Sequence, residues 1–208
     1  MVFMSWNRPT SQQQQSCINK SGGFNYDKKY SGATSKQISE LHRDNDLAAD
    51  GFHLNHARVL LGSGVDVYDK GKRALLSWSH FRFDWGFVDP KTPIEKGTKF
   101  CVCVKELIPW VMMPLQVVYV DQSRNATAVG GAYFGYGSGT LNGHLLAGEE
   151  RFSIKLDENN EVWYEILSIS KPAHILSLIT YPYVQLRQKY FASQSAKAML
   201  KHLGSKLS

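Results

Sequence analysis

The fold class follows from residues 149–170, which read EERFSIKLDENNEVWYEILSIS. Phe152, Ile154 and Leu156 alternate with polar residues, and this period of two is typical of a strand with one buried face. The turn-forming segment DENN, residues 157–160, leads into a second extended run, Glu161 to Ser170. The stretch therefore predicts two antiparallel strands joined by a hairpin.

The same period occurs upstream of the hairpin. Apolar residues recur at every second position in 100–104 and again in 115–119, and residues 51–61 alternate well enough to form an earlier strand. Short strands separated by turn residues pair in an antiparallel meander. We expect a sheet of about six strands.

Two helices frame these strands in the sequence. Asp66 can cap a short early helix, whose apolar residues recur at helical spacing between 67 and 78. Pro182 opens a longer amphipathic helix that runs to about Leu203. This order predicts an α+β, helix-grip-like fold, in which a curved antiparallel sheet wraps around the long C-terminal helix and leaves a cavity between them.

The domain organisation follows from length and local composition. The chain has 208 residues, enough for one domain with a substantial core. Residues 1–23 include the run Gln12 to Gln15 and no acidic residue, which predicts a flexible Gln/Ser-rich tail. Residues 24–204 are expected to form a single α+β domain.

The composition indicates which kinds of partner the protein can bind. Aromatic residues make up 12% of the chain, which favours a bulky core or a pocket of ligand size. A formal net charge of +6 permits an anionic membrane surface as a partner. No nucleic acid is expected, because the basic residues of the last helix also fit a solvated face. Nothing in the sequence indicates an oligomeric state.

No cofactor or metal is expected. Cys17, Cys101 and Cys103 are too few and badly spaced for a disulfide framework, so we expect an intracellular, reducing compartment. His53 and His56 lack the further ligands that zinc needs.

The glycine-rich segment 135–139 (GYGSG) has two interpretations. Glycines let backbone N–H groups approach a phosphate closely, but a phosphate loop lies between a strand and a helix and usually carries a lysine. Here another strand follows, so a bend or bulge in the sheet is favoured.

Four polar residues could carry chemistry. His144 with Glu149 or Glu150 is the first candidate for an acid–base pair. Glu165 shares a strand face with apolar residues, which indicates either a salt bridge on that face or a carboxyl whose pKa is raised by burial. An enzyme is the weakest of three functional hypotheses, and it would depend on His144, Glu149 and Glu165.

Several short motifs together resemble an uncharacterised protein family shared by plants and bacteria. They are Leu61–Gly64, Trp78, Trp85, Val117–Val120, Phe134–Gly137, Thr140–Leu141, Gly143–His144, Gly148–Phe152, Ser170–Pro172 and Tyr181–Pro182. The resemblance covers residues 24–199 and brings no catalytic residue with it. The sequence is also similar to a small outer-envelope protein of plant chloroplasts. That resemblance implies a chloroplast envelope location, with the cytoplasm as the alternative.

Two hypotheses of function follow. The element order and the aromatic content favour a non-enzymatic binding module that holds an apolar or amphipathic small molecule or lipid. The envelope resemblance instead implies a cation-selective channel or a peripheral envelope protein. For the first hypothesis, the aromatic residues expected to line the cavity are Trp78, Tyr119, Phe134, Tyr136, Trp163, Tyr164 and Phe191.

Overall fold

The computed structural model describes residues 2–106, 108–124 and 131–204. Its strands are β1 (Phe3–Ser5), β2 (His53–Ser63), β3 (Gly86–Phe87), β4 (Lys99–Lys105), β5 (Trp110–Arg124), β6 (Ala132–Thr140), β7 (Leu146–Leu156) and β8 (Glu161–Pro172). Its helices are α1 (Ser11–Lys20), α2 (Ile38–Leu41), α3 (Asn45–Ala49), α4 (Val65–Leu76), α5 (Ile175–Ile179) and α6 (Tyr181–Leu203). Short 3-10 helices are η1 (Lys28–Tyr30), η2 (Ala33–Ser35) and η3 (Ser79–Phe81).

All strands belong to one antiparallel sheet with the order β2-β8-β7-β6-β5-β4-β3. The short strand β1 pairs with the first residues of β5. Strand β2, the first long strand in the sequence, pairs with β8, the last one. The predicted α+β fold is confirmed, although β1 and β3 take the strand number to eight rather than about six.

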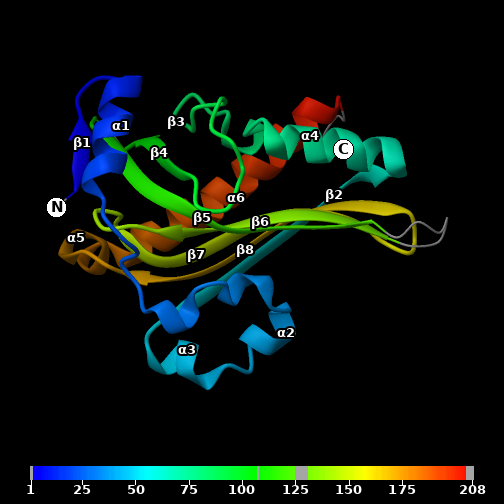
Figure 1. Cartoon of the computed structure of the whole chain (residues 1–208), viewed down its shortest axis with the longest axis horizontal. Coiled ribbons are helices and arrows are strands. Elements are labelled where there is room, and N and C mark those ends of the chain that lie inside the picture. The colour runs from blue at the N-terminus through cyan, green and yellow to red at the C-terminus, as the bar shows by residue number, and fades with distance from the viewer. Residues whose placement is uncertain (1, 107, 125–130, 205–208) are drawn as a thin grey trace.

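The helices cover both faces of the sheet. Figure 1 shows α4 and α6 on one side and the short helices α2 and α3 on the other. The early helix predicted at Asp66 is α4, but it begins at Val65 after Gly64, so Asp66 lies in its first turn rather than at its cap. The predicted C-terminal helix is α6, which has Pro182 in its first turn and ends before Gly204 in a left-handed conformation. The sheet curves around α6, as a helix-grip fold requires.

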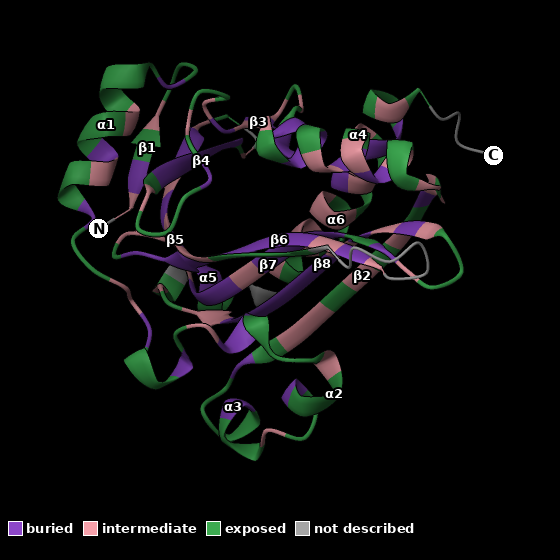
Figure 2. Ribbon diagram, turned by 45° about the vertical axis from the view of Figure 1, so that its right-hand side comes forward, coloured by how far each residue is buried: buried purple, intermediate pink, exposed green. Residues whose placement is uncertain are grey.

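The main core lies between the sheet, α4, η3 and α6. Trp78 is 1% exposed, and its ring centroid lies 4.8 Å from that of Phe100 and 5.5 Å from that of Tyr136. The buried His80 lies against the same group, with its ring centroid 4.7 Å from that of Phe152. Figure 2 shows the middle of β6, β7 and β8 as buried. This aromatic cluster fixes one end of the space between sheet and helix.

The two halves of α6 differ in burial. In the C-terminal half Met199 is fully buried, and Ser195 shares a hydrogen bond of 2.6 Å with the hydroxyl of Tyr164 on β8. In the N-terminal half Leu186 is 66% exposed and Tyr190 is 44% exposed. Tertiary contacts therefore hold the C-terminal half of α6 against the core.

Residues 2–23 are ordered, which differs from the flexible tail that the sequence predicts. Their β1 pairs with β5, and α1 begins with a capping box in which the Thr10 hydroxyl accepts from the Gln13 N–H while the Gln13 side chain accepts from the Thr10 N–H. Phe3 and Cys17 are buried with Cys101, Cys103, Trp110 and Met112. The glutamine run is thus the outer surface of a docked helix.

The glycines of residues 135–139 lie inside β6, not in a loop. They share one face of this strand, and a Cβ atom at Gly137 would collide with the ring of Tyr119. A Cβ atom at Gly139 would collide with Tyr26. The register shift is in β5, where Val118 is the extra residue opposite Gly137 and Ser138. The glycines therefore make room for aromatic rings and do not form a phosphate loop.

We predict that Gly137→Ala lowers the free energy of unfolding by about 1–3 kcal/mol, because the Tyr119 ring must leave its place. Chemical denaturation followed by circular dichroism measures this change. Gly23→Ala is the matched control, because no atom lies within 4 Å of the Cβ position there. Equal stability of the two variants would contradict this account of the glycines.

Candidate functional site

A cavity of about 740 Å³ lies between the concave face of the sheet and α6. Pockets of this size hold drug-sized or lipid-like molecules. The apolar lining residues come from the strands, from η3 and from α6, and include Phe81, Val102, Val104, Met113, Leu115, Tyr164, Ile166, Val184, Phe191 and Ala192. Aliphatic and aromatic side chains make up most of this wall.

Polar contacts tie the N-terminal half of α6 to the rim of the cavity. Gln188 donates to the Ser170 hydroxyl at 3.0 Å and accepts from the Asn55 amide at 3.5 Å. Arg187 forms an ion pair of 3.0 Å with Glu106 at the end of β4, and Tyr183 donates to the same carboxylate at 2.6 Å. These bonds bridge the open side of the space without filling it.

A polar row crosses the floor of the cavity. In the sheet register Glu150 of β7 lies beside Ser138 of β6 on one side and Ser168 of β8 on the other. All three residues line the cavity. Among the described residues none donates a hydrogen bond to the Glu150 carboxyl or forms an ion pair with it, so this group faces the cavity without a protein partner.

Burial controls the ionisation of this carboxyl. Loss of hydration raises the pKa of Glu150 from an ordinary value of 4.5 to about 8, and no positive charge opposes the shift. Glu150 is therefore mostly protonated at neutral pH while the cavity is empty. A protonated carboxyl can both donate and accept a hydrogen bond.

His144 also lines the cavity, at the β6–β7 connection. Its Nδ1 lies 2.9 Å from the Leu146 nitrogen and 3.0 Å from the Leu146 carbonyl oxygen, so it accepts from the N–H or donates to the carbonyl according to the tautomer. Burial lowers the pKa of His144 to about 4, although the Leu146 backbone opposes this effect. The ring is neutral at physiological pH and can donate one hydrogen bond.

The aromatic candidates lie in three places. Tyr164 and Phe191 line the cavity. Trp78, Phe134 and Tyr136 are buried in the core beside it, where the Tyr136 hydroxyl lies 2.7 Å from Nε2 of His80. Tyr119 and Trp163 lie on the opposite face of the sheet, where they contact Thr34 and Arg58 respectively.

Glu149 borders the cavity, but its carboxylate points to the opposite face of the sheet, which the N-terminal segments cover. Its carboxylate accepts from the Tyr26 hydroxyl at 2.7 Å, from the Gly32 N–H at 2.7 Å, and from both the N–H and the hydroxyl of Thr34. Burial raises the pKa of Glu149, and these hydrogen bonds oppose the rise. The carboxylate holds η2 and the preceding segment against the sheet.

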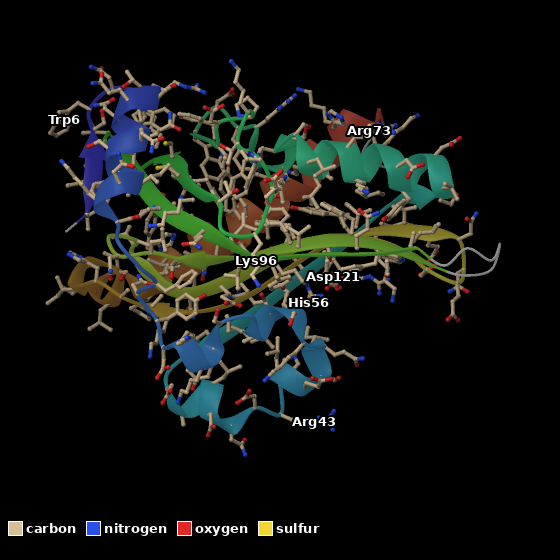
Figure 3. All side chains as sticks on the ribbon, in the orientation of Figure 1. Trp6, Arg43, His56, Arg73, Lys96 and Asp121 are labelled. Carbon is tan, nitrogen blue, oxygen red and sulfur yellow. The ribbon has the colours of Figure 1, made fainter. Side chains whose placement is uncertain are left out.

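Glu165 lies on this same covered face, in a charged cluster. It accepts from Arg151 at 2.6 Å and lies 3.2 Å from Nε2 of His56. Figure 3 shows His56 on the side of the sheet that faces α2 and α3. Burial raises the pKa of Glu165, but the hydrogen bond from His56 and the charge of Arg151 outweigh this effect and hold the pKa below its ordinary value. The salt bridge predicted for Glu165 is present.

The structure does not bring His144, Glu149 and Glu165 together. His144 lines the cavity, whereas the two carboxylates lie on the other face of the sheet. Of the two carboxyls paired with His144 in the sequence hypothesis, Glu149 and Glu150, the one that faces the cavity is Glu150. A sequence signal for this assignment exists, because Glu150 has the same strand parity as Phe152 and Ile154. The sequence interpretation did not include His80, which has no regular periodicity around it.

The described part of the chain has no group of three or more His, Cys, Asp or Glu residues suited to a metal ion. Cys101 and Cys103 lie with their sulfur atoms 3.8 Å apart, and both are buried. Hydrogen bonds with Cys103 and Cys17, together with burial, raise the pKa of Cys101, so its thiol stays protonated. Nor does any helix in the described ranges have the length and apolar character needed to cross a membrane.

Residues 34–198 match the family model described as Domain of unknown function (DUF1990). The chain belongs to this family. A UPF0548 protein of Arabidopsis thaliana is 64% identical over 99% of this chain and 100% of its own length. UPF0548 proteins of Dictyostelium discoideum and Deinococcus radiodurans are 31% and 28% identical, over 88% and 78% of this chain and 86% and 82% of their own lengths. DUF1990 members thus occur in plants, amoebae and bacteria. The relatives give no support for the chloroplast envelope resemblance.

Two solved structures resemble this chain in the path of the backbone. The hypothetical protein jhp0584 of Helicobacter pylori gives a TM-score of 0.44 with 15% identity, over 74% of this chain and 86% of that chain. Ara h 8.0201 gives a TM-score of 0.43 with 12% identity, over 73% of this chain and 99% of that chain.

We predict that Glu150→Gln raises the free energy of unfolding at pH 7 by about 1–3 kcal/mol. Folded protein keeps the Glu150 proton up to a pKa of about 8, whereas the unfolded chain releases it near 4.5. Between these values the folded state binds more protons, so the contribution of Glu150 to stability falls as pH rises.

Urea unfolding at several pH values between 5 and 8 measures this effect as the difference between wild type and variant. Glu158→Gln, an exposed charge loss in the β7–β8 turn, is the matched control. A difference that does not change with pH would show that Glu150 ionises normally in the folded protein.

Proposed function

We propose that this protein is a non-enzymatic binding module that holds an apolar or amphipathic small molecule, or a lipid, between its sheet and α6. The cavity of about 740 Å³ is the observation that carries the proposal. Its walls are mainly apolar, and a few hydroxyl, amide and carboxyl groups interrupt them. Binding sites for small molecules commonly combine these features.

The polar groups support binding more than catalysis. Glu150 and His144 are both uncharged at neutral pH when the cavity is empty, because burial shifts their pKa values to about 8 and about 4. The hydroxyls of Ser138 and Ser168 lie beside Glu150, but no described residue forms a hydrogen bond that would activate either of them as a nucleophile. Two neutral hydrogen-bonding groups in an apolar wall orient a ligand.

The cation-channel hypothesis has no support from the fold or the family. A location at the chloroplast envelope, or otherwise in the cytoplasm, stays a prediction of the sequence. An anionic membrane surface as a partner also stays a prediction of the sequence. Fractionation of tagged protein, with an alkaline carbonate wash of the envelope fraction, tests the location and the mode of attachment together.

The binding proposal is tested by native mass spectrometry of gently purified protein and by titration with N-phenyl-1-naphthylamine, a neutral apolar fluorophore. We expect a bound molecule in the spectrum or saturable binding of the probe. Absence of both would overturn the proposal.

A cavity-filling variant locates the bound molecule. We predict that Ala192→Phe on α6 weakens probe binding at least about tenfold, because the added ring occupies the space next to Phe191. The exposed Ala48→Phe on α3 is the control and should bind as wild type does. Thermal unfolding shows whether both variants are folded. Equal binding by both folded variants would place the probe outside this cavity.

A further inference from the structure

The floor of the cavity presents a row of three oxygen-bearing side chains in a chamber whose lining is mainly apolar. Ser138, Glu150 and Ser168 occupy adjacent places on β6, β7 and β8. Ser138 is 1% exposed and Ser168 is 7% exposed. None of the described residues forms a hydrogen bond with either hydroxyl or with the carboxyl between them. All three residues line the cavity, so the hydrogen bonds of their side chains are available to a molecule that enters it, and a ligand that displaces water from the row must replace those bonds.

The charged groups of the surrounding elements do not pair with this row. Arg187 of α6 is paired with Glu106 at 3.0 Å. Arg151 is paired with Glu165 on the other face. Burial is the cause of the altered ionisation of Glu150, with no contribution from a neighbouring cation. Other titratable residues that line the chamber include His56 and Arg58 of β2, which pair with Glu165 and Asp157, and His144, Tyr164 and the exposed Lys189. Tyr136 and His80 lie in the core beside it.

The chemistry of the row selects a donor-rich, positively charged ligand group. A protonated primary amine carries three N–H donors and no acceptor. The row offers one carboxyl and two hydroxyls, which together can accept all three N–H bonds. A hydrogen bond between charged groups is about twice as strong as one between neutral groups. A ligand carboxylate would need Glu150 to stay protonated, because two ionised acids side by side repel, so its binding would weaken as pH rises.

We infer that the cavity selects a ligand with an apolar body and one protonated amino group, whose ammonium binds Glu150 between Ser138 and Ser168. This inference rests on the proposed binding function and names the ligand class. The apolar body lies against Ile166, Phe191 and Ala192, which line the same chamber.

The inference predicts that ligand binding releases a proton and that affinity depends on pH. The empty protein holds a proton on Glu150 up to a pKa of about 8. An ammonium ligand requires the carboxylate, so binding below this pH releases one proton, and affinity rises with pH until Glu150 is ionised in the free protein. A neutral hydroxyl ligand that accepts from the protonated carboxyl shows the reverse trend.

The test compares two ligands with one apolar body, 2-naphthalenemethylamine and 2-naphthalenemethanol, by calorimetry at pH 6.5 and pH 8. We expect the amine to bind at least about tenfold tighter than the alcohol at pH 8, and to gain roughly tenfold in affinity between the two pH values. Titration in buffers of different ionisation enthalpy measures the released proton on wild-type protein alone. This measurement needs no variant to fold.

Two variants assign the effect to the row. Glu150→Gln removes the preference for the amine and its pH dependence but keeps binding of the alcohol. Glu158→Gln, on the exposed turn, changes neither.

Different results would contradict the binding function and the ligand class. If N-phenyl-1-naphthylamine binds and the amine is no tighter than the alcohol at either pH, the ligand class is wrong and the binding function stands. If neither that probe nor either naphthalene ligand binds, the proposed function and the inference fall together. An amine preference that persists in Glu150→Gln also overturns the inference, because the selectivity then lies elsewhere in the chamber.

Discussion

The cavity depends on a difference between the two halves of α6, because the C-terminal half packs on the core whereas polar contacts tie the N-terminal half to the rim. The C-terminal half packs on the core through Met199 and Leu200, and Phe191 lies 5.1 Å from Phe81 between ring centroids. Bulky aromatic side chains from η3 fill the space there and set the distance between helix and sheet. The N-terminal half continues in the same direction over shorter and more polar side chains. The space that remains under it is the chamber.

Alternate side chains of strand β7 point to opposite faces of the sheet and have different roles there. Glu149 and Arg151 point to the N-terminal cover and bind η2, while Glu150 and Phe152 point to α6. Adjacent carboxyls therefore have opposite roles: one is saturated with hydrogen bonds and structural, and the other has no protein partner. Alternation along a strand is enough to produce this difference.

The sequence predicts the regular elements well because each has a local period. The β7–β8 hairpin, α4 and α6 follow from alternation and helical spacing in neighbouring residues. The docked N-terminus does not, because Cys17 and Phe3 are buried by residues of β4 and β5 far along the chain. The choice between Glu149 and Glu150 has the same origin. Their adjacent positions on a strand place them on opposite faces of the sheet. Only the tertiary contacts with Tyr26 and Thr34 decide which carboxyl finds hydrogen-bond partners within the protein.

The added strand β1 makes the first residues part of the chamber. Val2 and Met4 contribute to its wall, and main-chain pairing with β5 holds them there. Trp6 follows at the outer margin of the molecule, where Figure 3 labels it, and is 78% exposed. An N-terminal affinity tag is therefore attached next to residues of the cavity wall, whereas a tag after Gly204 follows the end of α6, whose last seven residues do not line the cavity. For recombinant protein, the position of the tag is a choice about the ligand site.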